Sequence, residues 1–230
     1  MNQHVTNGII LSRTNYGEAD RIIKLLTPAD GKISLLARGV RKPKSKMAGG
    51  IELFSVSSVT YIRGRGELGT LVSARLDKHY GAIVKRIDRV QLGYDLIKVL
   101  DRATEDEPEA EYFELLQQAF EALDDAAIDA MLVRFWFNVQ LLRLAGHSPN
   151  LQTDSTGESL APDSRYTFDF DTVSFAGLDS GAFTADHIKF LRLAFAGNTP
   201  RTLRQIAGGG ALLHDVMPLV QTMLTSYIRV

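Results

Sequence analysis

The chain has 230 residues, of which 45% are hydrophobic and 23% are charged. These fractions are close to the averages for globular proteins and argue against a fibrous or disordered chain. The absence of cysteine excludes disulfides, thiolate catalysis and Cys-ligated zinc. No apolar run approaches the ~20 residues that a membrane helix requires. The N-terminus lacks the pattern of a secretion signal, so we expect a cytoplasmic protein.

Charge is divided unevenly along the chain. Residues 1–78 carry 13 Lys and Arg against 6 Asp and Glu, a balance of +7. Residues 79–230 carry 13 basic against 21 acidic side chains, a balance of −8. A basic front followed by an acidic rear indicates that the front binds a polyanion. The alternative is a chance distribution of charges over solvated faces.

The first 79 residues are rich in β-forming residues and turn signals. This pattern predicts five strands, over residues 8–14, 19–26, 32–39, 51–63 and 68–76. Five short strands in one small domain are typical of an OB-type barrel. Gly64, Gly66 and Gly69 match the spacing of a dinucleotide-binding motif. The residues that follow them read as a strand and not as a helix, so a hairpin turn is the better interpretation.

Helical periodicity replaces the strand pattern after residue 79. Apolar residues recur at helical spacing over residues 80–103, 109–123, 128–145, 184–196 and 211–229. The third segment is apolar around most of its circumference, which predicts a central helix. Residues 148–183 are polar, with one alternating stretch that predicts a β-hairpin from Tyr166 to Phe175. The sequence thus predicts an α+β chain with an OB-type barrel (1–79), a helical domain (80–147 plus 184–230) and a small β insertion (148–183).

Patterns typical of catalysis are missing from the sequence. The five histidines show no metal-ligand spacing, and there is no G-x-S-x-G nucleophile elbow. Neighbouring carboxylates, such as Asp124 and Asp125, fall in segments expected to be exposed linkers or helix ends. We therefore expect a non-enzymatic protein with no catalytic residue and no cofactor.

The strongest local signal is a basic segment over residues 38–46. It places five positive charges within nine residues: Arg38, Arg41, Lys42, Lys44 and Lys46. Gly39 and Pro43 disfavour a helix there. Dense cations on a loop beside a β-barrel suit the neutralisation of phosphates with release of counterions. The alternative interpretation is a solvated loop.

Further cations of the front domain are candidates for the same surface. They are Arg21 and Lys24 on the second predicted strand, and Arg63 and Arg65 in a second basic turn. Aromatic residues that could stack on unpaired bases are Tyr16, Phe54 and Tyr61. Core packing explains each of these three rings equally well.

Several segments resemble the RecO family of bacterial DNA repair proteins. The resemblance rests on Gly8-Ile-Ile-Leu, on Tyr16-Gly-Glu-Ala-Asp-Arg-Ile-Ile-Lys-Leu-Leu-Thr27, and on Ala37-Arg-Gly-Val-Arg-Lys-Pro-Lys-Ser-Lys46. It continues in Leu141-Leu-Arg-Leu-Ala-Gly-His-Ser-Pro-Asn-Leu151. The resemblance implies an OB-fold domain, a helical domain and a zinc-finger-like insertion. It also implies binding to single- and double-stranded DNA, strand annealing, and work on the nucleoid with RecR, RecA and the single-strand binding protein.

The sequence departs from the family at the zinc site. The family often carries two C-x-x-C pairs after this Pro-Asn-Leu segment, and both pairs are absent here. The remaining donors between His147 and Phe183 are one histidine and six carboxylates, which do not suit a closed zinc site. We expect no bound metal and an insertion held instead by its apolar side chains, namely Tyr166, Phe168, Phe170, Val173 and Phe175.

The resemblance further implies that the acidic, apolar-ended tail of the single-strand binding protein is a ligand. A receptor for such a tail requires an apolar pocket edged by cations. Arg134 and Arg143 lie on the most apolar predicted helix, but nine positions separate them, so they face opposite sides. We expect Arg134, beside Phe135, to bind the tail; an arginine that only borders the core is the alternative.

These observations favour a DNA-binding recombination mediator that binds and anneals single strands. Two other interpretations remain open. An OB platform for single strands does not inherently distinguish DNA from RNA, so an RNA-binding protein is one alternative. A protein-interaction adaptor whose basic face meets an acidic partner is the other.

Overall fold

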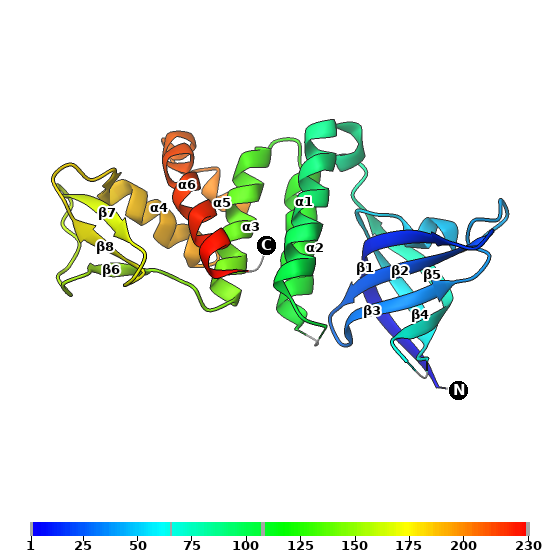
Figure 1. The fold of residues 1–230 in the computed structure, drawn as a ribbon. Coiled ribbons are helices and arrows are strands. Elements are labelled where there is room, and N and C mark those ends of the chain that lie inside the picture. The colour runs from blue at the N-terminus through cyan, green and yellow to red at the C-terminus, as the bar shows by residue number, and fades with distance from the viewer. Residues whose placement is uncertain (1, 65, 107–108, 229–230) are drawn as a thin grey trace. The chain divides into compact units, whose positions relative to one another are not determined.

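The computed structural model describes residues 2–64, 66–106 and 109–228. The fold is mixed α+β, as predicted, with a β-barrel at the N-terminus and helices plus a small second sheet in the remainder (Figure 1). The chain divides into two compact units, Met1–Ala126 and Ala127–Val230.

The first unit begins with a closed five-stranded barrel. Its strand order is β1-β2-β3-β5-β4, and β1 closes the barrel by pairing antiparallel with both β2 and β4. β3 and β5 pair in parallel, which completes the OB-type topology. The five-stranded OB-type barrel predicted from the sequence is therefore confirmed. The strands are β1 (Gln3–Tyr16), β2 (Asp20–Thr27), β3 (Gly31–Ala37), β4 (Ser55–Ile62) and β5 (Leu68–His79).

β1 is twice the predicted length, because one strand serves two neighbours. Residues 3–9 pair with β4, and residues 9–16 pair with β2, with a bulge in the second pairing between Ile10 and Ser12. A bulge bends a strand and increases its twist, which lets β1 turn the corner of the barrel. The fourth strand was expected to begin at Ile51, but this residue ends the 3-10 helix η1 (Ala48–Ile51), and β4 begins at Ser55. Ile51 is fully buried there and belongs to the barrel core.

Two antiparallel helices complete the first unit, α1 (Ile87–Ala103) and α2 (Ala110–Asp124). The helix expected from residue 80 begins later, after the short 3-10 turn η2 (Ile83–Lys85). The Asp124 carboxylate accepts hydrogen bonds from the backbone N–H groups of Ala82 (2.6 Å) and Ile83 (3.2 Å). These bonds hold the chain in a turn before α1. The compact unit thus extends beyond the barrel end expected at residue 79 and includes α1 and α2.

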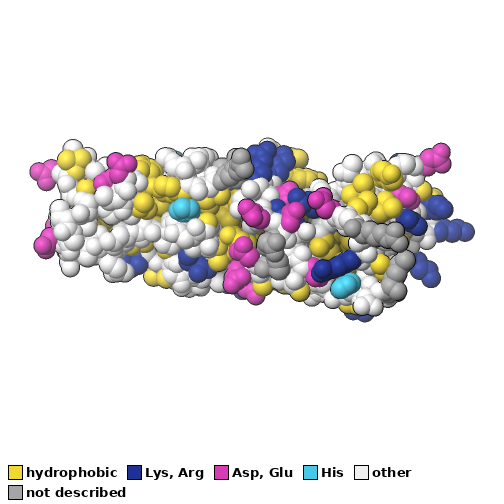
Figure 2. Space-filling view, turned by 60° about the horizontal axis from the view of Figure 1, so that its bottom comes forward, with side chains coloured by type: hydrophobic (Ala, Val, Ile, Leu, Met, Phe, Trp, Pro, Cys, Tyr) yellow, Lys and Arg dark blue, Asp and Glu magenta, His cyan; other side chains and the backbone are white. Residues whose placement is uncertain are grey.

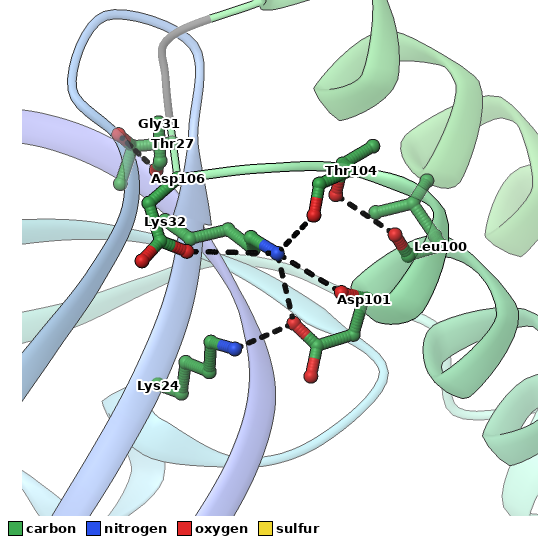
Figure 3. A network of polar contacts seen from close by, with 8 residues as sticks. All are labelled: Lys24, Thr27, Gly31, Lys32, Leu100, Asp101, Thr104 and Asp106. Atoms are coloured by element: carbon green, nitrogen blue, oxygen red, sulfur yellow. Dashed lines mark hydrogen bonds and ion pairs between the residues drawn. The ribbon is translucent and has the colours of Figure 1, made fainter. Parts of the chain in front are cut away.

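A buried lysine joins the barrel to the C-terminal end of α1 (Figure 3). The Lys32 ammonium on β3 donates to the backbone carbonyls of Asp101 (2.9 Å) and Thr104 (2.6 Å). It also lies 3.5 Å from the Asp101 carboxylate and 3.6 Å from that of Asp106. Only 4% of its side chain is exposed. A cation at the end of a helix satisfies its unpaired carbonyls and complements the helix dipole.

The second unit packs three helices around α3 and carries a four-stranded sheet. α3 (Ala130–Leu144) is buried on nearly all sides, which confirms the predicted central helix. Trp136 on α3 donates its indole N–H to the Asn198 carbonyl at 2.9 Å, and Gln140 donates to the Ala194 carbonyl at 2.8 Å. The other helices are α4 (Ala185–Phe195), α5 (Pro200–Leu203) and α6 (Gly209–Tyr227).

The sheet lies in the segment predicted as a β insertion. Its order is β6-β8-β7-β9, from β6 (Asn150–Asp154), β7 (Arg165–Asp169), β8 (Ser174–Gly177) and β9 (Phe183–Thr184). β7 and β8 form the predicted hairpin, with Phe168 opposite Phe175. Phe175 is fully buried, and its ring makes edge contacts with those of Phe168 and Phe183. The aromatic rings therefore form the centre of this small sheet.

One residue of the predicted apolar set, Phe170, does not lie where it was expected. Phe170 was expected on the buried face of the strand, but 39% of it is exposed. The reason is that β7 ends at Asp169, and the chain then turns, with Val173 in the left-handed backbone region (φ 50°). The alternation of faces holds only within a strand, so it no longer applies at Phe170.

Within residues 2–64, 66–106 and 109–228, no cluster of three or more His, Cys, Asp and Glu side chains is arranged to hold a metal ion. None of the helices in the same ranges is both long and apolar enough to span a bilayer.

Candidate nucleic-acid interface

Five exposed cations lie together on the loop that follows β3. We call residues 38–46 the basic loop; its cations are Arg38, Arg41, Lys42, Lys44 and Lys46. All five are exposed, and among the described residues no carboxylate forms an ion pair with them. Figure 2 shows Lys and Arg side chains gathered at the end of the barrel on the right of the view. The basic segment predicted from the sequence is therefore a loop that presents its five cations to solvent.

Hydrogen bonds attach the basic loop to the turn between β1 and β2. The Gly39 backbone N–H donates to the Asp20 carboxylate at 2.7 Å. Arg41 donates its backbone N–H to the Ala19 carbonyl (2.9 Å) and its guanidinium to the Gly17 carbonyl (3.2 Å). Between these anchors, the side chain of Val40 is 3% exposed and packs in the barrel core. The start of the loop is therefore fixed on the barrel.

The rest of the loop folds as consecutive turns. Gly39 has a positive φ of 63°, a conformation that glycine adopts without strain. Lys42 donates its backbone N–H to the Gly39 carbonyl at 3.1 Å, and Ser45 donates to the Lys42 carbonyl at 2.9 Å. The backbone is thus ordered while the long cationic side chains remain in solvent. Such an arrangement presents positive charge to a polyanion at a low cost in backbone entropy.

Arg21 is the other predicted cation near this loop. It is half-buried on β2 opposite Ala37, the residue that precedes the loop. Its guanidinium donates to the Asn15 side-chain carbonyl at 3.1 Å. Arg21 therefore lies at the same end of the barrel as the basic loop.

Two predicted cations are already paired with carboxylates. The Lys24 ammonium lies 2.7 Å from the Asp101 carboxylate of α1 (Figure 3). Arg63 forms an ion pair with Asp30, which also accepts the Tyr61 hydroxyl at 2.8 Å. Burial, together with this hydrogen bond to Asp30, raises the pKa of the Tyr61 hydroxyl above its ordinary value. The charges of Lys24 and Arg63 are thus partly neutralised within the protein.

Arg63 also lies away from the basic loop. Its partner Asp30 lies three residues after the end of β2, whereas Arg21 and the loop lie at the beginning of that strand. The eight residues of β2, each rising about 3.3 Å, separate the two ends. The structure therefore does not bring Arg63 together with the loop cations. Arg65, the last predicted DNA contact, lies outside the described residues.

The three candidate stacking residues have different environments. Phe54 and Tyr61 are 2% and 1% exposed and belong to the packed interior, so the core interpretation holds for both. Tyr16 is 55% exposed at the end of β1. Of the three rings, Tyr16 is therefore the one accessible to a base.

Sequence reasoning missed the residue that orients the basic loop. Asp20 was read as part of a strand segment, yet its carboxylate fixes the loop through the Gly39 N–H. The available signal was an aspartate three positions after Gly17, the glycine of a turn. Short acidic side chains at such positions commonly accept backbone N–H groups.

The second unit contains an apolar pocket of about 350 Å³. Arg204 and Asp129 are its charged lining residues, and the N-terminal residues of α6 form part of its wall. Arg134, the predicted partner contact, does not line the pocket but lies three positions after Met131, which does. Residues three apart are neighbours on a helix face, so Arg134 shares a face of α3 with the lining residue Met131. The apolar lining consists of Met131, Leu132, Phe190, Leu203, Gly209, Gly210 and Leu213.

Comparison with known proteins gives consistent matches along the chain. The family model described as "Recombination protein O N terminal" matches residues 1–80, and the one described as "Recombination protein O C terminal" matches residues 86–228. The first model covers the barrel together with the basic loop. The second covers the two helices of the first unit and almost all of the second unit.

Similar curated proteins carry the name DNA repair protein RecO. That of Syntrophus aciditrophicus is 32% identical over 168 residues, 72% of this chain and 64% of that protein. That of Desulfatibacillum aliphaticivorans is 34% identical over 149 residues, 64% of this chain and 58% of that protein. The Listeria welshimeri protein is 29% identical over 199 residues, 82% of this chain and 75% of that protein.

The first two alignments thus span 58–64% of the length of those relatives. The family models cover the chain more completely, because together they reach from residue 1 to residue 228 with a short gap. The OB-type barrel and the helical units agree with this assignment. The chain therefore belongs to the recombination protein O (RecO) family.

Proposed function

We propose that this protein is a DNA-binding mediator of recombinational repair, with the basic loop as its main contact to the DNA backbone. The name of its relatives points to DNA repair, and the exposed, unpaired cations of the loop carry the argument for DNA binding. Arg38, Arg41, Lys42, Lys44 and Lys46 would neutralise phosphates and release the counterions condensed on the strand. Arg21 contributes from the neighbouring end of β2.

Annealing follows from charge neutralisation without bond chemistry. Two strands repel one another through their phosphates, and a cationic surface offsets this repulsion where they meet. The ordered backbone of the loop holds the cations in place before DNA arrives. Lys24 and Arg63 would contribute less to binding, because their ammonium and guanidinium groups must first leave Asp101 and Asp30.

A salt titration tests the loop directly. If about four to six phosphates are neutralised, log affinity for single-stranded DNA should fall with log salt at a slope near −3 to −4, from roughly −0.7 per phosphate. Replacing Arg41, Lys42, Lys44 and Lys46 together with alanine should weaken binding and flatten the slope. Circular dichroism would show that the variant remains folded. An unchanged slope in the folded variant contradicts the loop assignment.

A matched variant controls for the loss of net charge. Four exposed cations on other elements can be replaced by alanine with the same change in formal charge: Lys85, Lys98, Arg102 and Lys189. This control should retain most of the affinity and a steeper salt slope than the loop variant. Equal effects of both variants would mean that net charge, and not the loop, drives binding.

The same binding assay separates the alternative functions. Labelled single-stranded DNA, RNA of matched sequence and an acidic peptide are titrated in parallel. Preference for DNA supports the proposed mediator, and preference for RNA supports an RNA-binding protein. Binding of the acidic peptide alone supports an adaptor.

We also propose that the pocket beside α3 receives the acidic, apolar-ended tail of the single-strand binding protein. The apolar lining suits the terminal side chain, while Arg204 in the lining and Arg134 on the helix face of Met131 suit its carboxylates. Calorimetry with the tail peptide should show weaker binding for Arg134→Ala and for Arg204→Ala. Equal affinity of Arg134→Ala and the unchanged protein would remove Arg134 from the site.

A further inference from the structure

An exposed tyrosine lies directly beside the basic loop. Tyr16 is the last residue of β1, and 55% of it is exposed. Among the described residues, the other large exposed aromatic side chains are Tyr94 at 41% and Phe170 at 39%. Tyr94 lies on α1 and Phe170 lies after β7, so neither belongs to the loop region. Among the described residues, Tyr16 is therefore the large exposed aromatic side chain of the loop region.

Hydrogen bonds on both sides of Tyr16 tie it to the loop. Gly17, the next residue, accepts the Arg41 guanidinium at 3.2 Å through its carbonyl. Asp20, the cross-strand partner of Tyr16, accepts the Gly39 N–H at 2.7 Å. The backbone that carries the ring is therefore fixed relative to the backbone that carries the cations.

We infer that Tyr16 is a base-stacking residue that gives the basic loop a preference for single-stranded over double-stranded DNA. This inference rests on the proposed function. The loop cations contact phosphates, which both forms of DNA present, so they cannot distinguish a single strand from a duplex. An aromatic side chain stacks on the face of an unpaired base, whereas the bases of a duplex are already stacked on one another.

The arrangement matches the chemistry of single-strand binding sites. Such sites combine a cationic surface that follows the backbone with aromatic side chains on which bases stack. Here the two parts come from adjacent segments, the cations from residues 38–46 and the ring from the end of β1. The hydroxyl is not required for stacking, so phenylalanine should replace tyrosine without loss.

Three probes separate stacking from electrostatic binding. They are a short thymidine oligonucleotide, the same strand with abasic sites in place of bases, and a duplex of equal length. Tyr16→Ala should weaken binding to the thymidine strand by about 5- to 150-fold, equivalent to ~1–3 kcal/mol for one stacked base. Its affinity for the abasic strand and for the duplex should stay within about twofold, because the phosphate contacts remain.

Two variants act as controls. Tyr16→Phe keeps the ring and should retain the affinity of the unchanged protein for all three probes. Tyr94→Ala removes another exposed tyrosine on α1 and should leave binding unchanged. Circular dichroism of each variant would show whether the fold is retained.

The possible results are distinguishable. If the loop variant loses affinity while Tyr16→Ala binds the thymidine strand normally, stacking by Tyr16 is wrong and the proposed function stands. If Tyr16→Ala weakens all three probes equally, Tyr16 acts through the loop backbone, and the inference is overturned. If none of the probes binds the unchanged protein, the proposed function itself is wrong.

Discussion

Replacing Lys32 by methionine should destabilise the first unit while leaving its shape unchanged. Methionine has a similar length and no charge, so the apolar part of the packing is retained. The substitution removes two charge-assisted hydrogen bonds, from the ammonium to the carbonyls of Asp101 and Thr104. It also removes a cation from the C-terminal end of α1, where the helix dipole favours one.

The expected loss follows from the burial of this lysine. A hydrogen bond to a charged group contributes ~1.5–3 kcal/mol, and breaking a buried ion pair costs ~3–5 kcal/mol. The side chain of Lys32 is 4% exposed, but the Asp101 carboxylate keeps a second cation, Lys24, at 2.7 Å. We therefore expect a loss of about 3 kcal/mol in the free energy of unfolding. With a urea m-value of about 2 kcal/mol/M, the midpoint should fall by about 1.5 M.

Lys24 offers a matched control at the same carboxylate. Its side chain is 32% exposed, so Lys24→Met should cost only ~0–1 kcal/mol. Hydrogen exchange at increasing urea concentration, followed by mass spectrometry of the full chain, would report on the two units separately. Peptides from β3 and α1 should lose protection in Lys32→Met, while peptides from α3 should not. A shift of less than about 1 kcal/mol, or equal shifts for both lysines, would refute the reasoning.

Three further predictions concern the backbone and the small sheet. Gly50→Ala should destabilise the barrel, because the added methyl group would lie 2.5 Å from a backbone carbonyl oxygen of β5. At Gly49 an added methyl group meets no atom within 4 Å, so Gly49→Ala should lower the melting temperature far less in a thermal melt. Phe168→Ala truncates a buried aromatic ring and should lower the free energy of unfolding by ~3 kcal/mol or more, whereas Phe170→Ala, at an exposed ring, should cost less. A chelator should leave the melting temperature unchanged. Stoichiometric zinc by elemental analysis would contradict the expected absence of metal. Hydrogen bonds from a threonine hydroxyl and from backbone N–H groups lower the pKa of Asp154. The contribution of Asp154 to stability is therefore present above the ordinary aspartate pKa near 4 and is lost as pH falls through the lowered value. In acid titrations, Asp154→Ala should therefore show a weaker loss of stability below pH 4 than the unchanged protein.

Local sequence patterns were sufficient to predict the class of fold and the number of strands in the barrel. Turn residues and short β-forming runs mark the strands, because a strand is a continuous run of residues and its residue types can be read directly from the sequence. The central position of α3 followed from its apolar circumference, which leaves no face for solvent. The exposure of the basic loop followed in the same way, since five cations within nine residues cannot be buried without partners.

Element boundaries were less predictable, because tertiary contacts set them. β1 extends from Gln3 because its first half finds a partner in β4, whose paired residues lie 47 to 59 positions further along the chain. α1 begins at Ile87 because the Asp124 carboxylate accepts the backbone N–H groups that precede it. Neither partner is visible in the local pattern of the segment concerned.

The roles of individual cations and aromatic rings were decided only by the tertiary structure. Lys24, Arg63 and the loop lysines look alike in sequence, but Lys24 and Arg63 meet carboxylates from distant segments. Within the part of the chain that the structure describes, the loop cations meet no carboxylate. Tyr16, Phe54 and Tyr61 are likewise equivalent by residue type, and only Tyr16 ends its strand in solvent. Composition determines which charges and rings a chain has. Which of them remain available to a ligand depends on long-range pairing, because a charge met by a carboxylate, or a ring buried in a core, is already satisfied within the protein.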